Sequence, residues 1–204
     1  SKELEDYASE RILKLLNIND SDIIYTSGAS ESNNTAIKGI CFKYSNRGKH
    51  IITSKLEHSS VSKCMDFLID NGFEVDYVNI LDNGLIDLDH LKSLIRDDTI
   101  LVSLSYVDSE LGIVQPIKDI SLILKNYPKC FFHVDCTQAV GKIDVDFSLM
   151  DLASMSGHKI FGLKGIGLLI KKEKIVIDPL IHGGKSSTIY RSGTPPLGLI
   201  VSLM

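Results

Sequence analysis

The chain has 204 residues, of which 44% are hydrophobic and 24% charged, and its formal net charge is −4. This is typical of one α/β domain with a sizeable core, and the mildly acidic balance argues against a nucleic-acid or membrane partner. No stretch approaches the roughly 20 apolar residues of a membrane-spanning helix, and the N-terminus lacks a signal-peptide pattern. The four cysteines have neither metal-ligand nor disulfide-framework spacing. We therefore expect a cytoplasmic protein without a metal site.

Both ends of the chain predict a fragment of a larger protein. The chain opens directly in a helical pattern, whose apolar face would contain Leu4, Tyr7, Ala8, Ile12 and Leu15. It closes on an apolar run over 196–204, in which Pro196 suits the first position of a helix. That run would be left exposed if nothing followed it.

The first predicted strand, 22–26, leads through the polar turn 27–34 into a helix. The apolar face of this helix contains Ala36, Ile37, Ile40, Cys41 and Tyr44. A strand, a small polar turn and a helix can point free backbone N–H groups at an anion, and the hydroxyls of Ser27 and Ser30 would add donors. One interpretation is therefore a phosphate cradle. The other is simple N-capping of the helix by Ser30, which requires no ligand.

The second junction between strand and helix carries a histidine. A strand over 50–53 is followed by a helix over about 57–71, and His58 lies where the two meet. Such a position is common for site residues in an α/β sheet. A capping or core role for His58 is the alternative. A strand over 75–78 and a helix over 87–95 follow.

Two buried strands and a carboxylate come next. The strand 100–105 is strongly apolar and is predicted to be central in a parallel sheet, and a helix follows over about 117–125. The strand 130–134 then ends on Asp135, with Gln138 three residues later. A carboxylate at that position needs a partner. Either a protonated pyridine nitrogen or a salt bridge to Arg or Lys would serve.

The segment 156–167 joins two further strands through a tight turn with several glycines. It places Lys159 where a carbonyl cofactor could form a Schiff base, although a solvated loop lysine is the alternative. Beyond it, 171–174 is predicted to be a charged turn in solvent and 183–187 a flexible loop. The alternating pattern predicts one doubly wound, mainly parallel α/β domain.

The strand ends together offer what pyridoxal phosphate requires, namely an anion cradle, a carboxylate, a lysine and an imidazole. In this pattern the chain resembles the cysteine desulfurase family, within the class V aminotransferase group of fold-type I pyridoxal-phosphate enzymes. The resembling stretches appear in the same order as in that family, and they are 26–34, 57–58, 110–116, 133–135, 156–167 and 191–194. The resemblance implies that 1–204 is the cofactor-binding large domain, lacking an N-terminal segment and the small domain.

The resemblance assigns roles to the reacting end of the site. Lys159 matches the Schiff-base lysine, and His58 matches the ring-stacking, acid–base histidine. Asp135 matches the partner of the pyridine nitrogen, and Gln138 the residue that hydrogen-bonds the ring hydroxyl.

It also assigns the phosphate ligands. Ser30, next to Ala29 in the cradle, stands where the family commonly has threonine, and Ser156 and His158 match further ligands. Thr194 matches a ligand donated by the second subunit, which implies a homodimer.

The chain departs from the family pattern in three places. The usual Asn-Asn-Glu is here Asp108-Ser109-Glu110, so that Ser109 replaces an amide near the ring, and the glycine-rich loop reads Gly-Gly-Lys-Ser-Ser over 183–187. The catalytic cysteine and the substrate-carboxylate arginine would lie beyond residue 204. None of the four cysteines matches the persulfide position, and we expect Cys136 to be a small buried residue behind the cofactor.

By resemblance the whole enzyme would convert L-cysteine to L-alanine. The sulfur would be held as a persulfide and passed to an acceptor protein for iron–sulfur cluster or thio-cofactor assembly. The fragment alone is expected to be inactive. Two alternatives remain, a related enzyme such as a selenocysteine lyase or an aminotransferase, and a non-catalytic scaffold.

Overall fold

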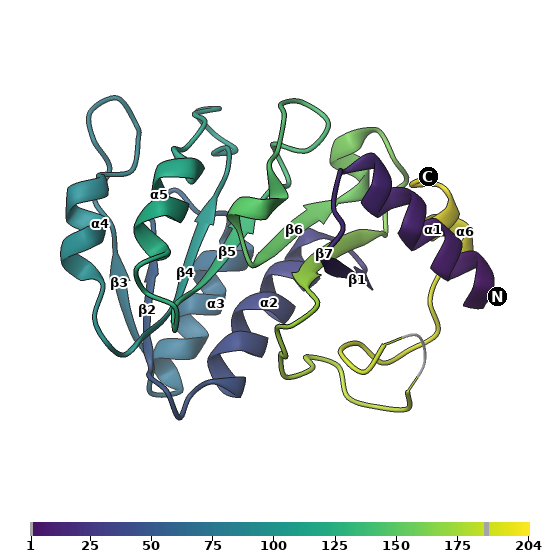
Figure 1. The fold of residues 1–204 in the computed structure, drawn as a ribbon, viewed down its shortest axis with the longest axis horizontal. Helices are drawn as coiled ribbons and strands as arrows, with labels where there is room; N and C mark the ends of the chain where they lie inside the picture. The colour runs from purple at the N-terminus through teal and green to yellow at the C-terminus, as the bar shows by residue number, and fades with distance from the viewer. Residues whose placement is uncertain (1, 186–187) are drawn as a thin grey trace.

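A computed structural model describes residues 2–185 and 188–204. It has one sheet of seven strands between two layers of helices (Figure 1). The helices are α1 (Lys2–Leu15), α2 (Ala29–Lys43), α3 (Ser59–Asp70), α4 (Leu88–Leu94), α5 (Ile117–Leu124) and α6 (Leu197–Val201). The strands are β1 (Ser21–Thr26), β2 (His50–Thr53), β3 (Glu74–Tyr77), β4 (Thr99–Ser105), β5 (Phe131–Asp135), β6 (Leu152–Ser156) and β7 (Gly167–Lys172). The predicted elements are confirmed, and most boundaries differ by one or two residues. The exception is α2, which begins at Ala29, so that most of the predicted polar turn 27–34 is the first part of this helix.

The sheet order is β1-β7-β6-β5-β4-β2-β3. The pairs β2–β3, β2–β4, β4–β5 and β5–β6 are parallel, whereas β7 is antiparallel to both β1 and β6. The mainly parallel sheet is therefore confirmed. Because β7 alone among the described strands runs the other way, the carboxyl ends of β1, β2, β4, β5 and β6 meet at one edge.

Both faces of the sheet are covered, which explains why its strands are almost continuously apolar. One core cluster joins the sheet to α1, α4, α5 and α6, and the other joins it to α2 and α3. Neighbouring residues of a strand enter opposite clusters, as Leu101 and Val102 of β4 do. β4 is buried along its whole length and lies inside the sheet, as predicted.

The terminal helices lie side by side at one end of the sheet (Figure 1). Ile200 of α6 is fully buried in the same cluster as Ala8 and Ile12 of α1. The expectation that the closing apolar run would be exposed is therefore wrong for this part of α6. The predicted apolar face of α1 is only partly correct, because Leu4, Tyr7 and Leu15 are exposed.

Lys171 corrects the prediction of a solvated charged turn over 171–174. This lysine is the fifth residue of β7 and is fully buried. Its Nζ donates to Asp22 Oδ2 at 3.1 Å and to the carbonyl of Lys172 at 3.0 Å, and lies 4.8 Å from the centre of the Tyr190 ring. The antiparallel register pairs Lys171 directly with Asp22. The charge is buried with a partner, which sequence periodicity does not reveal.

Within the described part of the chain, no helix is long and apolar enough to cross a membrane. Of the predicted loop 183–187, the positions Ser186 and Ser187 lie outside the described residues.

Candidate active site

A cavity of about 550 Å³ opens at the carboxyl edge of the sheet. Its lining comes from the loops after β1, β2, β4, β5 and β6, and consists of Ser27, Gly28, Ala29, Ser30, Glu31, His58, Ser105, Val107, Ser109, Glu110, Asp135, Thr137, Gln138, Ser156, His158 and Lys159. Every predicted site residue except Thr194 lies on it. The edge is where ligands bind in open parallel sheets, because loops from several strands converge there.

Lys159 lies on a short 3-10 turn, Gly157–Ile160, directly after β6. The side chains of Lys159 and His158 are exposed, and Ser156 Oγ lies 2.9 Å from His158 Nδ1. Phe161 ends the turn in the left-handed region at φ 64°. A non-glycine residue there is uncommon, so the surrounding structure must impose this conformation.

The turn after β1 leads into α2 without a side-chain cap. Gly28 is the N-cap of α2, and no side-chain hydrogen bond caps this helix end. The alternative that Ser30 acts as N-cap is therefore wrong. Ala29 and Ser30 of the first turn of α2 line the cavity, and an uncapped helix start with a serine is a favourable place for an anion.

Glu31, in the first turn of α2, forms an ion pair with Arg191. Its Oε2 accepts from the backbone N–H of Ser27 at 2.8 Å, and its Oε1 accepts from Arg191 Nε at 2.9 Å. Burial acts to raise the pKa of this carboxyl, but the hydrogen bonds from Arg191 and Ser27 outweigh it and lower the pKa. The guanidinium of Arg191 thus stabilises the negative charge of Glu31.

Asp135 ends β5 with only 6% of its surface exposed. Its Oδ1 accepts from the backbone N–H of Thr137 at 3.0 Å, and its Oδ2 accepts from Asn33 Nδ2 at 2.9 Å. Among the described residues no Arg or Lys forms a salt bridge with it. The competing structural salt bridge is therefore not found, and the carboxylate remains able to meet a cation in the cavity.

His58 combines both predicted roles, since it caps α3 and lines the cavity. Its Nδ1 accepts from the backbone N–H of Ser60 at 3.1 Å and lies 2.9 Å from Ser60 Oγ. An imidazole nitrogen that accepts a hydrogen bond carries no proton. The neutral ring therefore has its proton on Nε2.

The remaining predicted site residues are Gln138, Ser109 and Thr194. Gln138 lines the cavity, and its Oε1 accepts from Lys142 Nζ at 2.7 Å. Ser109, in the loop after β4, also lines the cavity and is exposed. Thr194 lines a separate cavity of about 180 Å³. Ser27 lines both cavities, so Thr194 lies behind the cradle of its own chain.

Sequence reasoning missed the acid behind this cavity. Glu57 accepts from Ser54 Oγ and from Ser105 Oγ, each at 2.7 Å, and Ser105 lines the cavity. Burial raises the pKa of Glu57 to about 7, and the neighbouring charge of Asp135 adds to the rise. The sequence signal was its place next to His58, in the loop that follows β2, where site residues of α/β sheets are common.

All four cysteines are unpaired and buried, as expected for Cys136. Burial raises the pKa of the Cys136 thiol well above its ordinary value, with a further contribution from Asp135. A thiolate is the nucleophilic form of cysteine, and burial in apolar surroundings makes such a thiol inert.

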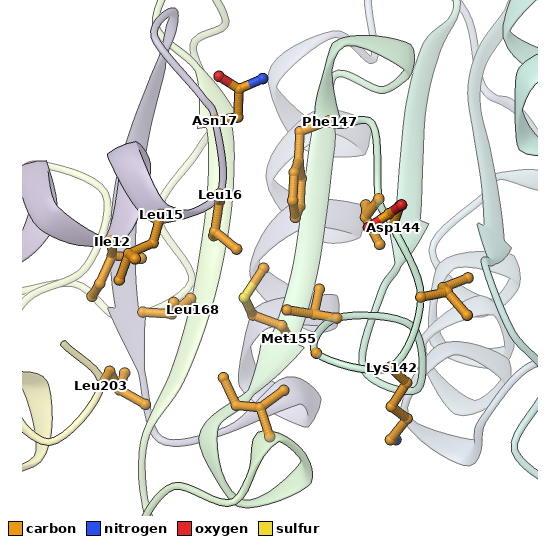
Figure 2. A pocket seen from close by; sticks show the side chains of 15 residues that line it. Ile12, Leu15, Leu16, Asn17, Lys142, Asp144, Phe147, Met155, Leu168 and Leu203 are labelled. Carbon is orange, nitrogen blue, oxygen red and sulfur yellow. The ribbon is translucent and has the colours of Figure 1, made fainter.

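A larger cavity, of about 800 Å³, shares no lining residue with the first (Figure 2). It is a mainly apolar groove between the end of α1 and the loop 140–147, with Met155 and Leu168 of the sheet between them. The described residues that line it are mostly apolar, with Asn17, Lys142 and Asp144 as the polar members.

The strand-end cavity fits pyridoxal phosphate. It presents an amine on Lys159, a carboxylate on Asp135 that lacks a cationic protein partner, and a cradle of N–H and hydroxyl donors. An aldehyde, a pyridine nitrogen and a phosphate are the complementary groups. The cluster also contains an imidazole against which a flat ring can lie.

Comparisons with known proteins agree with this fit. At 47% identity over 207 residues, the chain is similar to the cysteine desulfurase IscS of Buchnera aphidicola, and at 46% to that of Vibrio cholerae. These alignments cover 100% of this chain and 51% of each relative. The chain thus spans about half the length of the curated relatives it matches.

Solved structures give the same result. A NifS-like protein superposes with a TM-score of 0.94 at 36% identity, covering 98% of this chain and 56% of that one. DndA from Streptomyces lividans superposes at 0.90 with 35% identity, covering 99% and 59%. A structure described as SspA in complex with cysteine superposes at 0.92 with 40% identity, covering 98% and 59%.

These neighbours identify the fold as that of the fold-type I pyridoxal-phosphate enzymes. The sequence profile described as aminotransferase class V matches residues 2–204, almost the whole chain. The chain therefore belongs to the class V aminotransferase family.

Proposed function

We propose that this chain is the cofactor-binding domain of a cysteine desulfurase, which converts L-cysteine to L-alanine and retains the sulfur as an enzyme persulfide. The observation that carries the proposal is the convergence of Lys159, Asp135, His58 and the cradle at 27–30 on one cavity. Pyridoxal phosphate is the cofactor of this family. The names of the relatives and the cysteine complex of SspA support cysteine as the substrate.

The residues of the cavity would hold the cofactor at three points. Ala29 and Ser30 at the start of α2, with Ser156 and His158, would bind the phosphate. Asp135 would bind the pyridine nitrogen, while Gln138 and Ser109 would face the ring edge. When bound, the protonated ring withdraws electrons from an amino acid attached to its aldehyde.

Two side chains would move protons. Lys159 would hold the aldehyde until the substrate amine displaces it, and its freed amine could then accept or deliver a proton at Nζ. His58 keeps its proton on Nε2 and would stack on the ring. General acid–base steps of this kind contribute about 10²–10⁴ in rate each.

The sulfur step requires a thiolate that the described residues do not supply, because the cysteines are buried. In that step an enzyme thiolate would attack the sulfur of the bound cysteine. The carbon–sulfur bond breaks, a sulfur–sulfur bond forms, and the substrate carbon receives a proton to give alanine. We expect the 204-residue chain alone not to produce persulfide at enzymatic rates, so efficient production by it would contradict this assignment.

The assembly is part of the proposal. Thr194 would serve the phosphate of a second copy in a homodimer, which agrees with its position outside the cavity of its own chain. A sulfur-acceptor protein would receive the persulfide for iron–sulfur cluster or thio-cofactor assembly. Four unpaired cysteines suit the reducing cytoplasm, where we place the protein.

The test is the visible spectrum of the purified chain with added pyridoxal phosphate. We expect a yellow band that borohydride fixes to the chain and that mass spectrometry assigns to Lys159. Lys159→Ala should lose the band, whereas Lys164→Ala, an exposed lysine of the same loop, should keep it. A band that survives in Lys159→Ala, or none in the chain or the full-length protein, would overturn the proposal.

A further inference from the structure

Asn33 of α2 is a fully buried polar side chain directly behind the cavity. Its Nδ2 donates to Asp135 Oδ2 and to Ser60 Oγ, at 2.9 Å in both cases. The three residues come from different elements, since Asp135 ends β5 and Ser60 lies in the first turn of α3. One amide therefore connects three parts of the site.

The orientation of this amide is fixed by its acceptors. The reversed amide would turn the carbonyl oxygen of Asn33 toward the carboxylate of Asp135, and two acceptors facing each other repel. In the observed orientation Asn33 Oδ1 is buried and has no hydrogen-bond partner among the described residues. A buried acceptor without a partner is unfavourable, so the two donated bonds determine the placement of this side chain.

The hydrogen bond from Asn33 gives the carboxylate of Asp135 its second donor. Thr137 N–H donates to one carboxylate oxygen and Asn33 to the other, so the plane of the carboxylate is set by one donor on each oxygen. Each oxygen keeps a further lone pair that can accept from a donor in the cavity.

The second bond reaches His58 through Ser60. Because Ser60 Oγ accepts from Asn33, its own hydrogen is free to point at His58 Nδ1, 2.9 Å away. The backbone N–H of Ser60 donates to the same nitrogen. Nδ1 of His58 thus has two donors, and the proton stays on Nε2.

We propose that Asn33 is a positioning residue of the cofactor site, which orients the carboxylate of Asp135 and, through Ser60, reinforces the tautomer of His58 that the backbone N–H of Ser60 favours. The proposal rests on the proposed function for the identity of the ring that the two side chains would contact. The network itself is a property of the chain without a ligand. It has two arms, the connection to His58 through Ser60 and the bond to Asp135, and each can be tested separately.

The first arm is tested in the cofactor-free, full-length protein by NMR of isotope-labelled histidine nitrogens. The wild type should show His58 with its proton on Nε2. In Asn33→Leu, which keeps the branched shape and removes the donors, the ring signals should move part of the way toward those of a histidine free in water, because the backbone N–H of Ser60 still donates to Nδ1. Ser60→Ala should cause the same change, because it removes the hydroxyl that joins the two residues.

The second arm is tested with pyridoxal phosphate labelled at the ring nitrogen. In Asn33→Leu the ring-nitrogen signal should move from the protonated toward the neutral position. The dissociation constant of pyridoxal phosphate should rise about tenfold or more, since a hydrogen bond to a charged group is lost. Ser60→Ala retains the bond to Asp135 and should change the constant by less than about twofold.

Thr35→Val is the matched control, because Thr35 is a buried residue of the same helix whose hydroxyl has no partner among the described residues. It should leave both signals and the affinity unchanged. The proposal is overturned if Asn33→Leu behaves like Thr35→Val, or if Ser60→Ala does not move the His58 signals. If the wild type fails to bind pyridoxal phosphate, the proposed function fails, while the His58 measurement still decides the first arm.

Discussion

At the scale of single residues, the cavity is defined by buried polar groups whose partners come from distant parts of the sequence. Asn33 and Asp135 are 102 positions apart and Glu57 and Ser105 are 48 apart, yet each pair is hydrogen-bonded. His133, two residues before Asp135, lies between the hydroxyls of β4 and β6, with both ring nitrogens at 2.8 Å from Oγ atoms. Such groups carry most of the pH dependence expected of this chain.

Glu57 gives one such prediction. Its pKa is raised from the ordinary value of 4.5 to about 7, first by burial. Between these pH values the folded chain binds more protons than the unfolded chain, so the free energy of unfolding falls as pH rises through this range. The contribution lost is about 3 kcal/mol at most. Glu57→Gln should abolish it, which urea titrations between pH 4.5 and 7.5 would measure.

His133 acts in the opposite sense, since burial lowers its pKa to about 4 and stability is lost as pH falls below 6.5. The measured quantity is therefore the difference between wild type and Glu57→Gln at each pH. Glu110→Gln, which changes an exposed carboxylate on the same cavity, is the control for loss of one charge. A difference that does not vary with pH would contradict a raised pKa of Glu57.

At the scale of elements, the cradle depends on how closely β7 approaches the turn after β1. A Cβ added to Gly167 would lie 2.6 Å from backbone atoms of Gly28 and 2.8 Å from Thr26 Oγ1. Backbone atoms cannot move aside as a flexible side chain can. The glycine at 167 therefore allows the strand after the lysine turn to lie against the turn that forms the cradle.

We expect Gly167→Ala to destabilise the fold by about 1–3 kcal/mol through overpacking. It should also weaken pyridoxal phosphate binding, because the clash displaces the backbone of the cradle. Urea unfolding and a cofactor titration measure the two effects. Gly198→Ala in α6, where an added Cβ meets nothing within 4 Å, should instead be neutral or stabilise by up to about 1 kcal/mol. Equal effects at the two glycines would contradict the close approach.

At the scale of the whole molecule, Thr194 lies outside the cavity that the other predicted site residues line. Its small cavity is lined by Tyr25, Thr26 and the segment that contains Arg191. Arg191 donates a hydrogen bond to Glu31. The same ion pair thus connects the segment of Thr194 to the cradle of its own chain. Our proposal that Thr194 serves the phosphate of a second copy can therefore be tested in the assembled protein.

Mixed dimers test this arrangement. Lys159→Ala and Thr194→Ala chains, each carrying a different affinity tag, are refolded together and the mixed species is purified. If Thr194 acts across the interface, one site of the mixed dimer contains both native residues and should bind pyridoxal phosphate with wild-type affinity. If Thr194 acts within its own chain, the site that retains Lys159 should bind as weakly as in the Thr194→Ala homodimer.

The sequence by itself determined the order of strands and helices and the motifs at the strand ends. This was possible because apolar periodicity and the glycine-containing turns are local, and parallel strands bring their carboxyl ends to one edge. Ser30, His58, Asp135 and Lys159 could therefore be assigned to one cavity before the fold was known. Their individual roles at the cofactor remain predictions.

Only the tertiary structure decided the partners of the buried charges. The sequence predicts that Lys171 is solvated, but the antiparallel register of β1 and β7 places it beside Asp22, with its side chain buried. Asp135 could have been neutralised by an Arg or Lys, and it is Asn33, from a helix far away in the sequence, that holds it. Periodicity reports which face of an element is buried. The partner of a buried polar group depends on which elements pack together, and that is fixed only when the chain folds.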